Sequence, residues 1–383
     1  MTDSILKLCG HLFMNALRFG YFRQTGKAGK PQALSLEVTH RCIAKCIMCN
    51  IWKIPEHVED MSLKRWVAFL SSDLFSELIE LDITGGEPFL RKDLADLIGE
   101  ICRLKKENFT KLKSIAITTN GLLTGRVLEA SKSILENLRP ANLDLVMVCA
   151  MDAVGPIHDR VRCYPDAWKR VHETISGLKN LRDQYPNLII GLKTTVLPIN
   201  VNELEAISSY ANENGLFTII SPCIITPARY LNPDRSEDLA FDGKMKRAMI
   251  DFFRSDAFRW SFHAEALARY LETGIMKKPC TCGFNYLFVR STGEMLLCPL
   301  MGQSPGNIHD DSVTTLFHGQ KARRIRRRIG KSPECLSCTE PGLERYALPY
   351  QGLHYLFILV KQGRKDFLNL HRHMGLNKYF ESG

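Results

Sequence analysis

Short apolar runs alternate with amphipathic stretches of helical periodicity between residues 33 and 225. The runs predicted to be strands are residues 33–38, 78–84, 114–120, 143–150, 188–196 and 217–223. Helical patterns separate them, for example at residues 62–72, 92–105, 167–181 and 202–214. Near-continuous apolar strands joined by helices are typical of a parallel sheet, so we predict an α/β fold with six β-α units. Chemistry in such sheets lies at the carboxyl ends of the strands.

Composition limits the class of protein and the kind of cysteine chemistry. The chain has 383 residues, of which 45% are hydrophobic and 24% charged, as in a soluble globular protein. Its net charge of +10 favours anionic partners in general. The start of the chain lacks the features of a secretory signal, and no apolar run approaches the ~20 residues of a spanning helix. We therefore expect a cytoplasmic protein whose thirteen cysteines bind metal rather than form disulfides.

Three cysteines follow the first predicted strand, in the stretch VTHRCIAKCIMCNIWK. Cys42, Cys46 and Cys49 have the spacing C-x3-C-x2-C, which lets them converge on one cuboidal iron–sulfur cluster. Three thiolates on four irons leave one iron open to a substrate or cosubstrate, as an open position does at catalytic zinc. The alternative is a zinc site completed by His40 or His57.

The second predicted strand ends in TGGEPFL, residues 84–90. This stretch has neither the G-x-G-x-x-G spacing nor the Gly-Lys pair of the nucleotide-binding loops. It places two glycines, which have no side chain, and the carboxylate of Glu87 at the end of a strand.

Together, C-x3-C-x2-C after the first strand and GGEP after the second resemble the radical S-adenosylmethionine (radical SAM) enzymes. The resemblance runs through all six β-α units, roughly residues 33–225. It implies a partial (β/α)6 TIM-like barrel and a 4Fe-4S cluster whose open iron is chelated by the amino and carboxylate groups of S-adenosylmethionine. In that family, electron transfer from the cluster cleaves the cosubstrate to methionine and a 5′-deoxyadenosyl radical, which abstracts a substrate hydrogen.

The resemblance also implies roles for the residues of GGEP. Gly85 and Gly86 are expected to let the backbone approach the cosubstrate without a Cβ in the way. Glu87 is expected to offer its carboxylate to the ammonium group of the cosubstrate, and Pro88 to stiffen the turn. In TTNG, after the third strand, the corresponding candidates are Thr119 and Asn120.

The stretch AMDAVGPIHDRVR after the fourth strand is similar to the family pattern S-x-D-G…H-D-x-x-R-G. Asp152 and Arg162 are candidates to reach the ribose or the methionine carboxylate, with a simple turn cap as the alternative. Ala150 stands where a serine is common, and Cys163 where a glycine is usual. Lys193 and Thr195 on the fifth strand are weaker candidates.

A second cysteine group lies in CTCGFNYLFVRSTGEMLLCP and CLSCTEPG. The spacing from Cys282 through Gly293 to Cys298 is C-x10-G-x4-C, which predicts a short hairpin turning at the glycine. The predicted ligands of a second cluster are Cys282, Cys298, Cys335 and Cys338. This group resembles the twitch appendage, a truncated SPASM domain with one auxiliary 4Fe-4S cluster. Cys280 competes with Cys282 as first ligand, and a four-cysteine zinc site is the alternative.

Two further cysteines follow barrel strands and are candidates for catalysis. The Cys223 or Cys163 thiol could donate a hydrogen atom to a substrate radical, as in radical epimerases. The competing interpretation, which we favour, is that these thiols only pack and the auxiliary cluster accepts an electron from the substrate. The basic run at residues 321–331 is expected to be a solvated helix face.

The sequence therefore predicts four parts: an N-terminal amphipathic helix (1–32), a radical SAM partial barrel (33–278), a small C-terminal iron–sulfur cluster domain (279–342) and a helical tail (343–383). We expect the first helix to pack on the outside of the barrel, with contact to a membrane surface as the alternative.

The expected activity is hydrogen abstraction from a small metabolite, phosphorylated, sugar-like or lipid-linked, leading to dehydrogenation, epimerisation or rearrangement. A flavodoxin or ferredoxin is the expected electron donor. The first alternative is modification of a ribosomal peptide. We place it second because the roughly 32 residues before the first strand are too few for a leader-binding module of about 80 residues. The second is a non-catalytic metal-cluster scaffold that binds nucleic acid, although no nucleic acid is expected.

Overall fold

The computed structural model describes residues 2–258, 261–278 and 280–340, with isolated positions between 347 and 363. Six parallel strands form the first part of its sheet: β1 (Ala33–Thr39), β2 (Glu80–Gly85), β3 (Ser114–Thr119), β4 (Asp144–Ala150), β5 (Leu188–Val196) and β6 (Phe217–Pro222). They are hydrogen-bonded in sequence order. The predicted α/β fold with a parallel sheet is confirmed by the parallel pairing of these strands, whose apolar residues are mostly buried.

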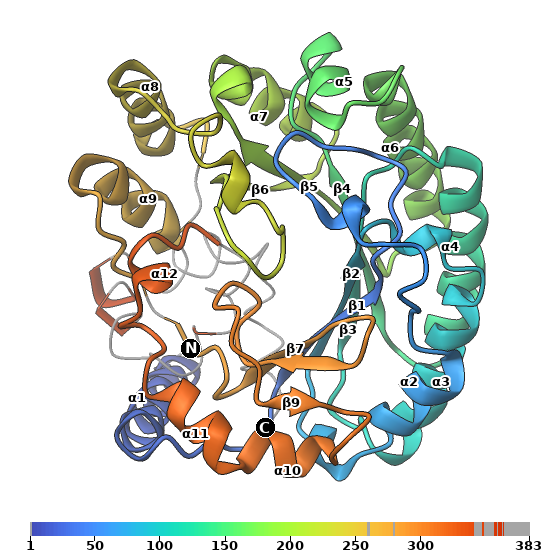
Figure 1. Cartoon of the computed structure of the whole chain (residues 1–383), viewed down its shortest axis with the longest axis vertical. Helices are drawn as coiled ribbons and strands as arrows, with labels where there is room; N and C mark the ends of the chain where they lie inside the picture. Colours follow the sequence, from blue (N-terminus) through green and yellow to red (C-terminus); the bar gives the residue numbers. More distant parts are fainter. Residues whose placement is uncertain are drawn as a thin grey trace.

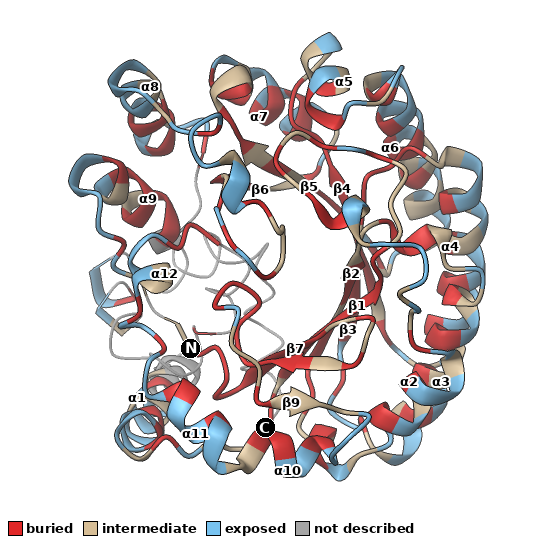
Figure 2. Ribbon diagram, viewed as in Figure 1, coloured by how far each residue is buried: buried red, intermediate tan, exposed pale blue. Residues whose placement is uncertain are grey.

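The helices lie in an arc around the outside of this curved sheet (Figure 1). They are α2 (Leu63–Leu70), α3 (Leu94–Glu107), α4 (Thr124–Leu138), α5 (Pro156–Arg162), α6 (Ala167–Gln184), α7 (Leu204–Glu213), α8 (Gly243–Arg254) and α9 (Ser261–Thr273). Their buried faces point toward the sheet and their exposed faces point outward, as Figure 2 shows. Within the described part of the chain, every helix is too short or too polar to traverse a lipid bilayer.

The C-terminal segment extends the same sheet, which the sequence did not indicate. Strand β7 (Tyr286–Val289) pairs in parallel with β1, with Ala33 opposite Tyr286. Strands β8 (Glu294–Leu296) and β9 (Gly306–Asn307) follow in antiparallel pairing. The hairpin predicted at Gly293 is confirmed: its φ is +82°, and a Cβ there would lie 2.6 Å from Asn307 Oδ1.

The first helix and the last short helices pack together beside β7. These are α1 (Thr2–Thr25), α10 (Val313–His318), α11 (Gln320–Arg326) and α12 (Pro333–Leu336). The expectation that residues 321–331 form only a solvated face is wrong for Arg326, because the Arg326 side chain is buried. Its guanidinium donates to the carbonyl oxygens of Phe317 (2.6 Å), Gly26 (3.4 Å) and Gly283, which ties three segments together. The expected helical tail 343–383 lies outside the described residues, apart from the isolated positions.

Candidate functional site

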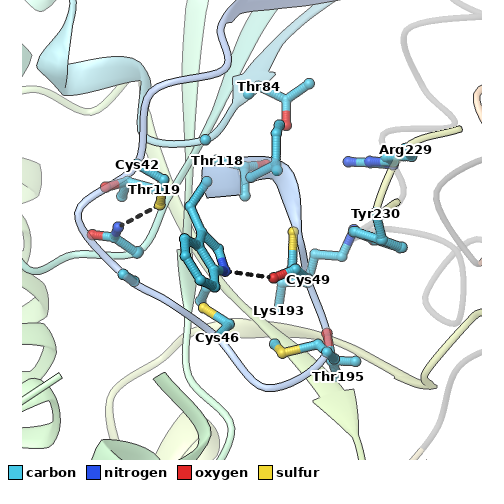
Figure 3. Close-up of a pocket in the computed structure, with 18 of the residues that line it drawn as sticks. Cys42, Cys46, Cys49, Thr84, Thr118, Thr119, Lys193, Thr195, Arg229 and Tyr230 are labelled. Carbon is cyan, nitrogen blue, oxygen red and sulfur yellow. Dashed lines mark hydrogen bonds between the residues drawn. The ribbon is translucent and has the colours of Figure 1, made fainter. Parts of the chain in front are cut away.

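A cavity opens at the carboxyl ends of the parallel strands, where the sequence predicts the chemistry (Figure 3). It encloses about 950 Å³ including its open mouth. Its lining includes Cys42, Cys46, Cys49, Gly85, Gly86, Thr119, Asn120, Ala150, Arg162, Lys193, Thr195 and Cys223. The fold therefore brings most of the predicted site residues to one place.

The two glycines of GGEP hold the base of the cysteine loop. The Gly86 amide donates to Thr39 O at 2.9 Å, and the Glu87 amide donates to Arg41 O at 2.8 Å. A Cβ on Gly85 would lie 2.1 Å from Thr39 O, and one on Gly86 would lie 2.2 Å from Arg41 O. Such distances are far inside van der Waals contact. Both glycines line the cavity, but the close approach that requires them is to the chain just before Cys42.

The residues around the cysteine sulfurs suit a thiolate-bound cluster. Asn120 Nδ2 lies 3.8 Å from Cys42 Sγ, and Arg162 Nη1 lies 3.7 Å from Cys46 Sγ. Such N–H groups stabilise negative charge on sulfur ligands. Burial raises the pKa of Cys42 and Cys49 to about 12. Without a metal these thiols stay protonated, so forming thiolates here is coupled to binding iron.

His40, which the zinc alternative would use, faces away from the three cysteines. Its Nδ1 lies 2.8 Å from Asp60 Oδ1 and 2.9 Å from Ser291 Oγ, and it does not line the cavity. In the described ranges, no set of three or more His, Cys, Asp or Glu side chains is arranged to hold a single metal ion.

Glu87 lies behind the cavity wall rather than in the cavity. Its carboxylate accepts hydrogen bonds from Asn120 N (2.7 Å), Thr119 Oγ1 (2.9 Å) and Phe89 N (3.2 Å). Burial raises the pKa of Glu87 to about 7, although these hydrogen bonds oppose the rise. Pro88 follows as the first residue of a 3-10 helix (Pro88–Leu90). In this structure the Glu87 carboxylate joins the second strand end to the third.

Asp152 is likewise turned into the protein. Its Oδ2 lies 2.6 Å from Arg162 Nη2, and its Oδ1 accepts a hydrogen bond from Thr195 N at 2.9 Å. Asp152 does not line the cavity, whereas Arg162 does. The carboxylate therefore orients the guanidinium that reaches Cys46.

The two candidate catalytic thiols have different surroundings. Cys223 follows β6 and lines the cavity. The expectation that Cys163 faces the site is wrong, because Cys163 is exposed at the C-terminal end of α5, outside the cavity. Its φ of 47° and ψ of 47° are left-handed, which explains why the family pattern has glycine there.

Cys163→Gly is expected to stabilise the protein by roughly 1 kcal/mol, because a left-handed conformation strains a residue that carries a Cβ. Thermal or urea unfolding of the two proteins measures the difference. Cleavage of S-adenosylmethionine should be unchanged. A variant of lower stability would show that the Cys163 thiol makes a contact of its own.

The cavity wall also carries residues that the sequence did not single out. Arg229 and Tyr230 come from the loop after β6 and line the cavity (Figure 3), and the Asn50 amide, next to Cys49, donates to Tyr230 O at 2.8 Å. Glu340 lies 3.5 Å from Arg229 Nη1 and 3.8 Å from Lys193 Nζ. The rule that active residues follow strand ends could have indicated the Arg229 loop. No local signal indicates Glu340, because it comes from the C-terminal segment.

A second cavity, of about 760 Å³ including its mouth, lies in the C-terminal segment. Its lining includes the four cysteines Cys280, Cys298, Cys335 and Cys338. Cys282 is buried, and burial together with the neighbouring Cys280 and Cys298 side chains raises the pKa of Cys282 well above its usual value. Cys280 lines the cavity and Cys282 does not.

Three consecutive residues connect the two cavities. Cys338 lines the second cavity, and Thr339 Oγ1 donates to Pro222 O at 2.7 Å, at the end of β6. Glu340 then reaches Lys193 and Arg229, which line the first cavity. The cysteine-rich segment thus contacts residues that line the barrel site.

Two family models match the chain, one over the barrel and one over the cysteine-rich C-terminal segment. Residues 36–211 match the family model of the radical SAM superfamily, and residues 280–339 match that of an iron–sulfur cluster-binding domain, SPASM. The chain is 25% identical over 303 residues to the antilisterial bacteriocin subtilosin biosynthesis protein AlbA of Bacillus subtilis, covering 77% of this chain and 61% of AlbA. It is 32% identical over 194 residues to a probable GTP 3′,8-cyclase of Methanococcus maripaludis, covering 48% and 56%.

Among solved structures, Streptococcus suis SuiB bound to S-adenosylmethionine matches with a TM-score of 0.56 at 15% identity, covering 83% of this chain and 73% of SuiB. SuiB bound to its precursor peptide SuiA matches with a TM-score of 0.54 at 16% identity, covering 85% and 74%. At this identity the likeness concerns the fold. The chain spans about three fifths of the length of the curated relatives described above.

Proposed function

The chain belongs to the radical SAM superfamily and carries a C-terminal SPASM-type cluster-binding domain, and from this premise we propose that it modifies a peptide substrate. Its cofactors are S-adenosylmethionine and two 4Fe-4S clusters, which confirms the cofactors expected from the sequence. The peptide is the alternative that the sequence placed second.

One observation favours the peptide over a small metabolite. The similarity to AlbA, named for the biosynthesis of a bacteriocin, extends over 77% of the chain, whereas the similarity to the GTP cyclase covers 48%. The match to AlbA is therefore long enough to include residues outside the barrel. The structural match to SuiB, seen with the peptide SuiA, also covers most of the chain.

In this proposal, Cys42, Cys46 and Cys49 hold the catalytic cluster at the cavity wall. When bound, the cluster supplies the electron that cleaves S-adenosylmethionine and so generates the radical that takes a hydrogen atom from the substrate. Asn120 and Arg162 direct N–H groups at the ligand sulfurs. The rest of the cavity receives the cosubstrate and the reacting residue of the peptide and limits the access of water.

A second candidate is a small anionic metabolite, as first expected. It is favoured by Lys193 and Arg229, two cations on the cavity wall that share the carboxylate of Glu340 at 3.8 Å and 3.5 Å. A carboxylate or phosphate of the substrate would compete with Glu340 for both cations. A peptide with an acidic side chain next to the reacting residue would use the same pair.

Coexpression of the enzyme with short peptides encoded next to its gene tests the proposal. A peptide substrate should return with an altered mass, such as a loss of about two mass units for each oxidised position. The same peptide coexpressed with the Cys42/Cys46/Cys49→Ala variant should keep its mass. If every peptide stays unmodified while a metabolite extract is converted, the second candidate holds.

The ligands of the auxiliary cluster are a separate proposal. We infer that Cys280, Cys298, Cys335 and Cys338 bind it, because these four line the second cavity. Cys280→Ser is expected to remove the auxiliary cluster, about four of eight irons, and Cys282→Ser to retain it. Iron analysis and the Mössbauer or EPR signal after anaerobic reconstitution measure this. If Cys282→Ser loses the auxiliary cluster and Cys280→Ser retains it, Cys282 is the ligand.

A further inference from the structure

The outward side of α1 carries an apolar stripe that the fold of the barrel does not use. It consists of Phe13, Met14, Leu17 and Tyr21, whose side chains are 48%, 62%, 54% and 51% exposed. Positions four apart on a helix share one face, so Phe13, Leu17 and Tyr21 form a continuous row. The opposite face, with Leu12, Phe19 and Phe22, is buried against the protein. The helix is therefore held in place by one face while the other offers large apolar side chains to solvent.

Exposed cations lie along and beside this stripe. Arg18, Arg23 and Lys27 are exposed on α1 or just after it, and Lys27 Nζ lies 3.3 Å from the Tyr21 hydroxyl. Helix α11 abuts the end of α1, where Arg326 Nη1 lies 3.4 Å from Gly26 O (Figure 1). The exposed cations of α11 and the residues after it are Lys321, Arg323, Arg324, Arg327, Arg328 and Lys331. Neither residues 4–36 nor residues 313–333 contain any Asp or Glu.

We propose that the α1–α11 face, made of this stripe and these cations, docks on an anionic lipid membrane surface. Large apolar side chains on a basic surface helix enter the boundary between headgroups and acyl chains, while Lys and Arg attract anionic headgroups. A nucleic acid or an acidic protein would engage the cations but leave the apolar stripe in water. The combination of both features therefore favours the lipid surface.

This docking is independent of the peptide proposal and compatible with catalysis. None of the stripe side chains lines the barrel cavity or the second cavity. A membrane at the α1–α11 face leaves the cysteine loop and its cosubstrate site in place. Docking would bring the enzyme close to a substrate that is itself held at a membrane surface.

Sedimentation of the anaerobically reconstituted protein with vesicles tests the proposal. Binding is expected to vesicles of phosphatidylglycerol and phosphatidylcholine, with at least about tenfold weaker binding to pure phosphatidylcholine. Leu17→Glu and Arg324→Glu/Arg328→Glu should each weaken binding about tenfold, since one removes apolar burial and the other removes charge attraction. All variants should keep their iron and cleave S-adenosylmethionine as the wild type does, because the changed positions are exposed.

Matched control variants distinguish an effect of this face on vesicle binding from an effect of net charge or of any exposed apolar side chain. Ile189, 38% exposed on β5, supplies the apolar control Ile189→Glu. The exposed pair Lys244→Glu/Lys246→Glu changes the net charge as much as the arginine pair does. Neither control should alter vesicle binding. Equal binding to both vesicle types, or no effect of Leu17→Glu, would overturn the proposal. So would binding of a single-stranded RNA or an acidic flavodoxin that depends on Arg324 and Arg328 but not on Leu17.

Discussion

Replacing Cys42, Cys46 and Cys49 together by alanine is expected to abolish cleavage of S-adenosylmethionine while about half of the bound iron remains. The three sulfurs line one cavity and come from one loop, so their loss removes every protein ligand proposed for the catalytic cluster. The second cavity has its own cysteines and should still load. Iron content and the yield of 5′-deoxyadenosine under dithionite give both quantities.

The matched control removes three cysteines that line neither cavity. Cys9/Cys102/Cys163→Ala should keep about eight irons per chain and cleave the cosubstrate normally. Cleavage that survives in the Cys42/Cys46/Cys49→Ala protein would contradict the assignment of the catalytic cluster. Loss of all iron from that variant would instead show that the two cluster sites depend on each other to form.

Gly86→Ala is expected to have the next largest effect. The added Cβ would lie 2.2 Å from Arg41 O and 2.8 Å from His40 O, which are backbone atoms without freedom to rotate away. The cysteine loop must then shift at its base, and a displacement of ~1 Å costs about 10²-fold in rate at a reacting centre. We expect the catalytic cluster to load poorly and cleavage to fall by at least that factor.

Gly99→Ala is the control for Gly86→Ala. Gly99 lies inside α3, and an added Cβ there meets no atom within 4 Å. This variant should be as active as the wild type and slightly more stable, by roughly 0.5–1 kcal/mol, because alanine favours helices over glycine. Gly86→Ala with a full complement of iron and normal cleavage would show that the loop tolerates the shift.

Much of the barrel follows from local patterns in the sequence. The fifth predicted strand, residues 188–196, matches β5 at both ends, and the first differs from β1 by one residue. Apolar runs bounded by helical patterns predict such strands because burial on both faces leaves little choice of residue. The strand-end rule then locates the site, since the parallel strands all deliver their last residues to one edge of the sheet.

The direction of individual side chains could not be predicted in the same way. Glu87 and Asp152 stand at the expected strand ends, yet both carboxylates point into the protein, toward Asn120 and Arg162. Spacing along the chain places a residue on a loop, but the neighbouring loops decide where its side chain points. Whether Glu87 also reaches the cosubstrate stays a prediction.

Long-range packing accounts for the other differences. Cys280 and Cys282 lie only two positions apart, and only the packing of the hairpin shows which one lines the cavity. Arg326 has the same sequence context as its exposed neighbours, but its helix turns it toward Gly283 and Phe317. The pairing of β7 with β1 joins residues some 250 positions apart, beyond any local pattern.

Transfer of deuterium from a substrate to 5′-deoxyadenosine tests the central claim most directly. The reconstituted enzyme is incubated anaerobically with S-adenosylmethionine, dithionite and a perdeuterated peptide encoded next to its gene, and the nucleoside is examined by mass spectrometry. We predict 5′-deoxyadenosine heavier by about one mass unit, together with a modified peptide. Unlabelled 5′-deoxyadenosine with every such peptide, and labelled 5′-deoxyadenosine with a deuterated metabolite pool, would contradict the claim.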